Sequence, residues 1–175
     1  MESPLSFVPT MFFASLLLFI SSPSSTKAST QFVETVCSQT INNSECLKAL
    51  ESDPRTASAS NYKEIAPIAL DLAIVNAKDS YAFINNLIKT NPSEAVKQCA
   101  DSYKFVVLDF QSARKELDED TLTANYDIKM AVDDNISQCE TALKSGVQVP
   151  EISFRNNLVY FYSNIGDVIT EKLIN

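Results

Sequence analysis

Apolar residues recur at every third or fourth position along four long segments that follow residue 60. The segments cover residues 62–89, 93–117 and 123–144, and a stretch that begins after Pro150. A helical repeat of about 3.6 residues places such side chains on one face, so the pattern predicts four amphipathic helices. The predicted inward positions are Leu70, Ile74, Ala77, Tyr81, Ile84 and Ile88; Val96, Ala100, Tyr103, Val107, Phe110, Ala113 and Leu117; Ile128, Val132, Ile136, Cys139 and Leu143; and Phe154, Leu158, Phe161, Ile165, Val168 and Leu173.

Short breaks separate the four segments. They lie at Asn91-Pro92, at the acidic residues 118–120 and around Gly146. Breaks of this length leave no room for crossover connections. The chain is therefore predicted to be all-α, with an up-down-up-down four-helix bundle over residues 61–175.

Single residues mark where these helices begin, end or weaken. Ser93 is a plausible N-cap for the second helix, and Gly146 follows the end of the third. Pro67 indicates either the start of the first helix or a kink in it. Gly166 lies inside the fourth helix, where glycine costs about 1 kcal/mol relative to alanine.

Two shorter helical segments precede the bundle, at residues 31–40 and 44–52. Asn43 or Ser44 can cap the second of them, and Asp53-Pro54 ends it. A polar stretch at residues 55–60 then reads as a linker. Residues 29–60 are therefore predicted to form a helical hairpin and linker before the bundle, and residues 29–175 to form one domain.

The N-terminus carries an apolar run at residues 11–20, followed by a stretch rich in serine and proline. This run suits a secretory signal and is shorter than the roughly 20 residues that span a bilayer. We expect residues 1–28 to be a signal peptide cleaved after Ala28, with Ser22 and Ser25 as other possible positions. An uncleaved anchor or a buried helix is the alternative. Cleavage implies a secreted protein.

The composition excludes several classes of function. The chain has two glycines and no tryptophan or histidine, which leaves little material for hairpin turns or phosphate-binding loops. The net charge is −8, and loss of Glu2 and Lys27 with the signal leaves it unchanged. Nucleic acid and anionic membranes call for a basic patch, so we expect neither as a partner. The charge is compatible with a basic protein partner, but it also suits ordinary solubility.

Four cysteines remain in the mature chain, and three pairings of them are possible. Proximity favours Cys37 with Cys46, across the two short helices. Cys99 lies about 18 residues before the end of the second long helix, and Cys139 about 16 residues after the start of the third. Antiparallel neighbours bring these two positions level, which favours the second pair. Without histidine or a CxxC pair, a metal site is not expected.

No catalytic constellation is present. The chain lacks histidine, the commonest general base, and shows no GxSxG, HExxH or Gly-rich motif. Acid pairs occur, as at Asp133 and Asp134, but neighbours on a helix point about 100° apart and cannot face each other across a cleft. We therefore expect the protein to have no enzymatic activity and to bind no cofactor. Sequons for N-glycosylation occur at Asn42, in the hairpin turn, and at Asn135, close to the cysteine-bearing face.

The layout of the cysteines resembles that of the plant invertase and pectin methylesterase inhibitor family. Local strings are similar as well: Cys37-x8-Cys46-x3-Leu50, C-A-D-S-Y at residues 99–103, and M-A-V-D-D leading to C-E at residues 130–140. The resemblance covers essentially the whole mature chain. It implies the same two disulfides and a secreted inhibitor, in the cell wall or vacuole, that blocks an enzyme's substrate cleft in a 1:1 complex.

The resemblance also bears on the target enzyme. Invertase inhibitors of the family can carry a Pro-Lys-Phe element just ahead of the third bundle helix, whereas residues 121–126 here read T-L-T-A-N-Y. We therefore favour pectin methylesterase over acid invertase. Tyr126, if exposed, suits an interface anchor, and if buried it caps the core. The candidate partner-binding residues are Glu119, Asp120, Tyr126, Asp127, Lys129 and Asp133.

Two further classes share these features. A secreted structural or storage protein would have the same bundle and disulfides without inhibiting an enzyme. A carrier of hydrophobic ligands would need a cavity, whereas the large residues in the stripes indicate a filled core.

Overall fold

The computed structural model describes residues 30–146 and 148–175, and within them it contains helices and no strands. The expected signal peptide lies outside the described residues. The elements are α1 (Gln31–Cys37), α2 (Asn43–Glu51), the 3-10 helix η1 (Pro54–Ser58), α3 (Tyr62–Leu87), α4 (Glu94–Glu116), α5 (Thr121–Met130), the π-helix η2 (Ala131–Ile136), α6 (Ser137–Ser145) and α7 (Pro150–Ile174). Because α5, η2 and α6 follow one another without a break, we call them together the third bundle helix.

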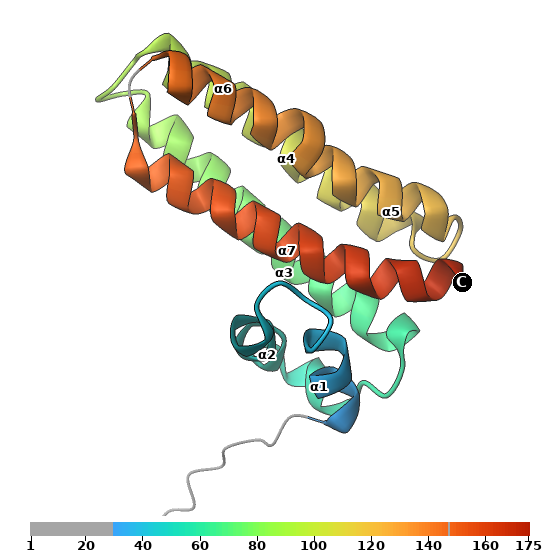
Figure 1. The fold of residues 1–175 in the computed structure, drawn as a ribbon. Coiled ribbons are helices and arrows are strands. Elements are labelled where there is room, and N and C mark those ends of the chain that lie inside the picture. Colours follow the sequence, from blue (N-terminus) through green and yellow to red (C-terminus); the bar gives the residue numbers. More distant parts are fainter. Residues whose placement is uncertain (1–29, 147) are drawn as a thin grey trace, which may run out of the picture.

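The four rods of the bundle are α3, α4, the third bundle helix and α7, and Figure 1 shows how they lie side by side. α3 packs against α4 and α7, and the third bundle helix closes the ring by packing against the same two helices. Successive rods run in opposite directions, which confirms the predicted up-down-up-down topology. None of the described helices is long and apolar enough to cross a membrane.

Side-chain caps set the N-termini of five of the described α-helices. In each, an oxygen of the capping residue accepts a hydrogen bond from the backbone N–H three residues ahead, a donor that the helix itself leaves unpaired. Ser93 caps α4 as predicted, whereas α2 is capped by Asn42 and not by Asn43 or Ser44. The capping residues of these α-helices are Thr30, Asn42, Asn61, Ser93 and Asp120.

The inward face of α7 differs from the predicted stripe. Phe154 is 63% exposed, and Leu158 and Phe161 are only half-buried. Of the predicted stripe, Ile165 is fully buried as expected. The face that points inward is otherwise rotated from the stripe, and much of it is small or polar. Its buried members are Ile152, Asn156, Val159, Ser163, Ile165, Gly166, Ile169 and Thr170.

Buried hydrogen bonds explain why polar residues occupy this face. Asn156 accepts from the Tyr103 hydroxyl at 3.0 Å, and Ser163 donates to the carbonyl of Ile128 at 3.0 Å. Thr170 accepts from the amide of Asn125 at 2.9 Å. A buried polar group with a partner avoids most of its desolvation cost, so a pattern of apolar residues alone misses it.

The two glycines are not used for left-handed backbone, since no described residue has a positive φ. They are sites of close approach. A Cβ on Gly166 would lie 3.2 Å from Cδ1 of Ile128, and one on Gly146 would lie 3.1 Å from Cβ of Ala95. Pro67, in turn, neither begins nor ends α3, which starts at Tyr62 and continues past it.

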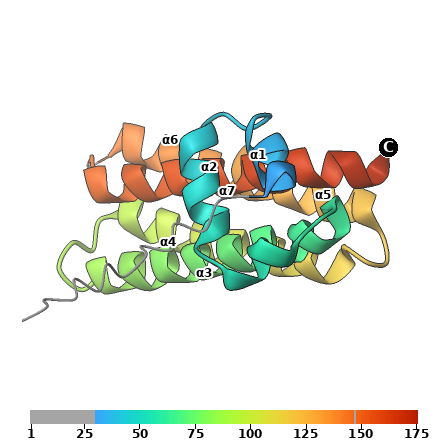
Figure 2. The same ribbon diagram turned by 90° about the horizontal axis from the view of Figure 1, so that it is seen from below.

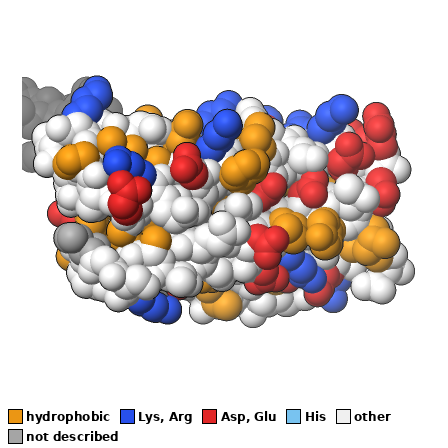
Figure 3. Space-filling view, turned by 90° about the horizontal axis from the view of Figure 1, so that it is seen from above, with side chains coloured by type: hydrophobic (Ala, Val, Ile, Leu, Met, Phe, Trp, Pro, Cys, Tyr) orange, Lys and Arg blue, Asp and Glu red, His pale blue; other side chains and the backbone are white. Residues whose placement is uncertain are grey.

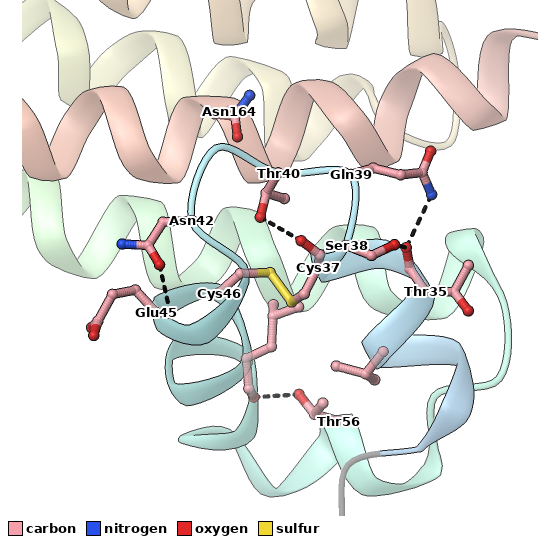
Figure 4. The surroundings of a disulfide bond; sticks show 12 residues. Thr35, Cys37, Ser38, Gln39, Thr40, Asn42, Glu45, Cys46, Thr56 and Asn164 are labelled. Carbon is pink, nitrogen blue, oxygen red and sulfur yellow. Dashed lines mark hydrogen bonds between the residues drawn. A yellow bond between two sulfur atoms is a disulfide. The ribbon is translucent and has the colours of Figure 1, made fainter.

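The hairpin of α1 and α2 lies across the α3–α7 side of the bundle (Figures 1 and 2). Its loop is held by Asn164 of α7, which accepts a hydrogen bond from the backbone N–H of Ile41 at 2.9 Å. Figure 4 shows Asn164 on the helix next to this loop and the disulfide of the hairpin. The predicted linker is not loose, because η1 packs there with Thr56 buried and donating to the carbonyl of Leu50 at 2.5 Å.

Both predicted disulfides are present. Cys37 pairs with Cys46 inside the hairpin, and Cys99 pairs with Cys139 between α4 and α6. All four cysteines are fully buried. The second bond joins positions that the antiparallel packing of α4 and the third bundle helix brings level, as the spacing predicted.

Candidate partner-binding face

The side of the bundle away from the hairpin is formed by α4 and the third bundle helix (Figure 1). We call the exposed surface of these two rods the outer face, which Figure 3 shows from above. Apolar, acidic and basic side chains are interspersed along it, and acidic ones gather at the end where α4 turns into α5. An outer face of this mixed character is available to a protein partner.

Large apolar side chains stand exposed on both rods of the outer face. Phe105 and Leu108 lie one turn apart on α4 and are 51% and 47% exposed. Leu122 and Tyr126 lie one turn apart on α5 and are 65% and 60% exposed. Tyr126 therefore does not cap the core, and its ring is free to serve as an interface anchor.

Two of the predicted acidic residues lie at the α4–α5 turn. Glu119 and Asp120 are exposed there. Asp120 caps α5 by accepting hydrogen bonds from the hydroxyl of Thr123 at 2.8 Å and from its backbone N–H at 3.1 Å. These bonds lower the pKa of Asp120, and the bond from the hydroxyl contributes most. Asp120 has a structural role at this turn, besides any role in binding.

The other predicted residues follow the third bundle helix. Lys129 forms ion pairs with Asp167 at 3.1 Å and Glu171 at 3.6 Å, and the hydrogen bond to Asp167 raises its pKa. The lysine is thus held by α7. Asp133 is exposed, whereas Asp127 is half-buried and has one carboxylate oxygen buried without a hydrogen-bond partner. Tyr126 and Asp133 remain the most accessible of the four.

A shallow hollow of about 490 Å³ runs between α4 and the third bundle helix near Asp133. No cation contributes to its lining among the described residues. It is lined by Gln98, Asp133, Asp134, Ser137, Gln138, Thr141, Ala142 and Ser145. Within the described ranges no cluster of three or more His, Cys, Asp or Glu residues could hold a metal ion.

One carboxyl group on this side of the bundle is partly withdrawn from water. Asp109 of α4 accepts a hydrogen bond of 2.6 Å from the amide of Asn135 in η2. Burial raises the pKa of Asp109 to about 6. The hydrogen bond from Asn135 opposes this rise, and the neighbouring carboxylates of Asp127 and Asp134 add to it. π-helical turns are rare and occur frequently at functional sites.

The sequence pattern did not identify all the residues of the outer face. Phe105, Leu108, Leu122 and Asp109 were not among the predicted binding residues. Phe105 and Leu108 lie off the predicted apolar stripe of α4, and large apolar residues on the polar side of a helix are a signal that could have identified them. Nothing in the sequence marks η2 or the burial of Asp109.

The two sequons lie in contrasting environments. Asn42 is exposed. In its side-chain amide, the oxygen accepts a hydrogen bond from the backbone N–H of Glu45 at 3.2 Å. Asn135 is buried, and its amide nitrogen donates to Asp109 and lies 3.4 Å from the carbonyl of Met130. A glycan attaches to the amide nitrogen, so only Asn42 offers that atom to solvent.

A disulfide-linked helical bundle with exposed aromatic side chains on one face fits a binding protein, and it also fits a structural one. Comparison with known proteins identifies the class further. The family model described as "Plant invertase/pectin methylesterase inhibitor" matches residues 31–167. The chain belongs to this family, which consists of inhibitors and not catalysts. Members of the family are extracellular proteins with an enzyme as partner.

Three comparisons show how far the likeness extends. A pectinesterase inhibitor of Actinidia deliciosa is 28% identical over 155 residues, which is 83% of each chain. A Platanus acerifolia protein that carries the name of an invertase inhibitor is 26% identical over 151 residues, 80% of this chain and 81% of its own. The crystal structure of a mutant pectin methylesterase inhibitor from Arabidopsis superposes with a TM-score of 0.69, at 22% identity, over 81% of this chain and 97% of that one. This superposition shows the shared fold.

Proposed function

We propose that the protein inhibits a plant pectin methylesterase by forming a 1:1 complex that blocks the enzyme's substrate cleft. The likeness to the Actinidia deliciosa inhibitor across 83% of both chains carries this proposal. Residues 121–126 support it, because they lack the Pro-Lys-Phe element that the family resemblance associates with invertase inhibition. The protein would act outside the cell, in the cell wall.

We further propose that the outer face makes the contact. The hairpin occupies the opposite side, which leaves α4 and the third bundle helix free. Interfaces tend to have aromatic anchors near their centre and a polar rim that excludes water. On the outer face, Tyr126 and Phe105 are the aromatic anchors, and Glu119, Asp120 and Asp133 supply acidic groups around them.

The target is tested by titrating the oxidised protein against a plant pectin methylesterase and, in a separate assay, against an acid invertase. We expect activity to fall linearly to a plateau near one equivalent in the methylesterase assay alone. Loss of activity only in the invertase assay would assign the protein to the second target, which the Platanus acerifolia relative favours. No loss in either assay would indicate a structural protein.

The face is tested by truncating one aromatic anchor. Removing a well-packed aromatic anchor typically costs 2 kcal/mol or more, so Tyr126→Ala should raise the inhibition constant by about 30-fold or more. Phe154→Ala is the matched control, since Phe154 is 63% exposed on α7, away from the outer face. Equal inhibition by both variants would exclude Tyr126 as an anchor.

Because of the acidic groups on the outer face, we expect the rate of association with the enzyme to depend on salt concentration. Carboxylates opposite a basic partner speed association, and dissolved salt screens this attraction over about 10 Å at 0.1 M. We expect the association rate to fall between 0.05 and 0.5 M NaCl, and to fall less for Asp133→Asn. An association rate that is the same at both concentrations contradicts the electrostatic part of the proposal.

A further inference from the structure

Lys129 is the one cation among the predicted binding residues, and it pairs with α7 instead of with its own helix. Its Nζ atom lies 3.1 Å from Oδ1 of Asp167 and 3.6 Å from Oε1 of Glu171. The lysine is partly exposed, and single ion pairs at a surface contribute little to stability. The pairing matters for where it holds the positive charge.

A buried amide fixes the carboxylate that holds the lysine. The amide nitrogen of Asn125 donates to the same Oδ1 atom of Asp167 at 2.7 Å, and to the hydroxyl of Thr170 at 2.9 Å. Asn125 is buried on the side of α5 that faces α7. A carboxylate held in this way has already lost most of its rotational freedom, which favours its pair with Lys129.

Two carboxylates of the third bundle helix lie one turn beyond Lys129. Asp133 follows the lysine by four positions and Asp134 by five, spacings that make residues neighbours on α-helical and π-helical turns. Both are exposed and line the hollow between α4 and the third bundle helix. Among the described residues, neither forms an ion pair. The nearest lysine along their own helix is thus committed elsewhere.

We propose that Asp167 is a positioning residue, which with Glu171 holds Lys129 on α7. Asp133 and Asp134 thereby stay free to bind a basic side chain of the partner enzyme. A lysine or arginine that enters the hollow then meets two carboxylates without a competing cation from this helix. This use of the two carboxylates rests on the proposed function, whereas the placement of the lysine is a property of the inhibitor alone.

The placement of Lys129 is tested on the oxidised protein without enzyme. NMR follows the signal of its Cε atom, which senses the charge beside the ammonium group. We expect Asp167→Asn to shift this signal, and replacement of Asp133 and Asp134 by asparagine to leave it in place. A signal that responds as strongly to the second change as to the first overturns the proposal.

A release variant, Asp167→Asn with Glu171→Gln, removes both charges that hold the lysine. The asparagine keeps an oxygen that accepts from Asn125. In this variant the Cε signal of Lys129 should become sensitive to replacement of Asp133 and Asp134, because the freed lysine pairs with a carboxylate one turn away. A signal that stays insensitive overturns the proposal.

The consequence for binding is tested by the rate of association with a pectin methylesterase at low salt. The release variant should associate about fivefold more slowly, because the freed Lys129 neutralises a carboxylate that attracts the enzyme. Adding Lys129→Gln removes the competing cation and should restore the rate to within about twofold of the unaltered protein. If Asp167 only stabilised the fold, removal of the lysine would restore nothing, and that result overturns the proposal.

A matched control separates this effect from the loss of negative charge. Asp79→Asn with Glu151→Gln removes two charges from α3 and α7, away from the outer face. This control also frees a cation, since Asp79 pairs with Arg155 at 2.7 Å. Its association rate should stay within about twofold of that of the unaltered protein. An equal fall in the control and the release variant overturns the proposal.

Two further outcomes are distinguishable. If the release variant does not fold, Lys129→Gln alone decides: an unchanged association rate supports the proposal, because α7 already neutralises this charge, and a slower rate overturns it. A protein that inhibits no pectin methylesterase fails the proposed function, and the NMR measurement then still decides where the lysine is held.

Discussion

The hydroxyl of Tyr103 on α4 donates a hydrogen bond of 3.0 Å to Oδ1 of Asn156 on α7. Both residues are fully buried, and burial raises the pKa of the tyrosine, which keeps its proton on the oxygen. Asn156 also lies 3.8 Å from the sulfur of Cys139. The pair therefore joins two rods across the bundle interior, beside the Cys99–Cys139 disulfide.

Removing this hydroxyl should destabilise the protein without changing its fold. Tyr103→Phe leaves the buried oxygen of Asn156 without its donor, and we expect the free energy of unfolding to fall by about 1–3 kcal/mol. Urea unfolding monitored by circular dichroism measures the loss. Tyr126→Phe is the control, because its exposed hydroxyl should matter by less than about 0.5 kcal/mol. Equal stability of the two variants would show that the buried bond contributes nothing.

A side chain at position 166 should disturb the contact between α7 and α5. Gly166→Ala places a Cβ 3.2 Å from Cδ1 of Ile128, inside the normal contact distance. The strain opposes the gain in helix propensity of about 1 kcal/mol, and Ile128 is fully buried and has little room to move. We expect a net loss of stability by thermal unfolding.

The double variant Gly166→Ala with Ile128→Val tests the cause of this loss. Valine lacks the Cδ1 atom that the new methyl group would meet. The double variant should therefore be more stable than the sum of the two single losses predicts, by about 0.5 kcal/mol or more. Strict additivity would mean that the contact with Ile128 is not the source of the strain.

The two disulfides should contribute unequally to stability. In the chain-entropy model, the stabilisation grows with the sequence separation, which is 9 residues for Cys37–Cys46 and 40 for Cys99–Cys139. Replacing a pair by alanines should cost about 2.5 kcal/mol in the hairpin and about 4 kcal/mol in the bundle. Denaturant unfolding of the two paired variants measures both. A larger loss in the hairpin would contradict this order.

Glycosylation should distinguish the two sequons. Expressed through a eukaryotic secretory pathway, the protein should carry one glycan, on Asn42, because that amide nitrogen faces solvent. Asn135 uses its amide nitrogen to bind Asp109, so a glycan there is incompatible with the fold. Intact mass should fall by one glycan in Asn42→Gln and stay unchanged, apart from the substitution, in Asn135→Gln. A glycosylated peptide containing Asn135 would refute this prediction.

Helical periodicity, capping preferences and cysteine spacing were sufficient to predict the bundle helices and their disulfides. Six of the seven predicted inward residues of α4 are buried, and three of the six in α3, where alanines fill much of the inward face. Ser93 caps α4 as its position predicted. Helical spacing also set Cys99 level with Cys139. These features depend on residues near one another in sequence or on simple antiparallel geometry.

Helical periodicity did not predict which face of α7 is buried. Its aromatic residues formed the more conspicuous stripe, yet the bundle buries the face that carries Asn156, Ser163 and Thr170. These side chains are acceptable inside only because Tyr103, Ile128 and Asn125 supply their hydrogen-bond partners. Such partners lie on other helices, 35 or more residues away in the chain, so no window of sequence reveals them.

By itself, the sequence determined the class of fold, the two disulfides, the family, and a preference for an acidic face around Tyr126. Those features follow from helical periodicity, cysteine spacing and local strings. Only the tertiary structure decided which side chains of that face are accessible, that Lys129 is held by α7, and that Asp109 is half-buried between two acids. Exposure and burial depend on which surfaces the four rods bring together, and that packing is a property of the whole chain.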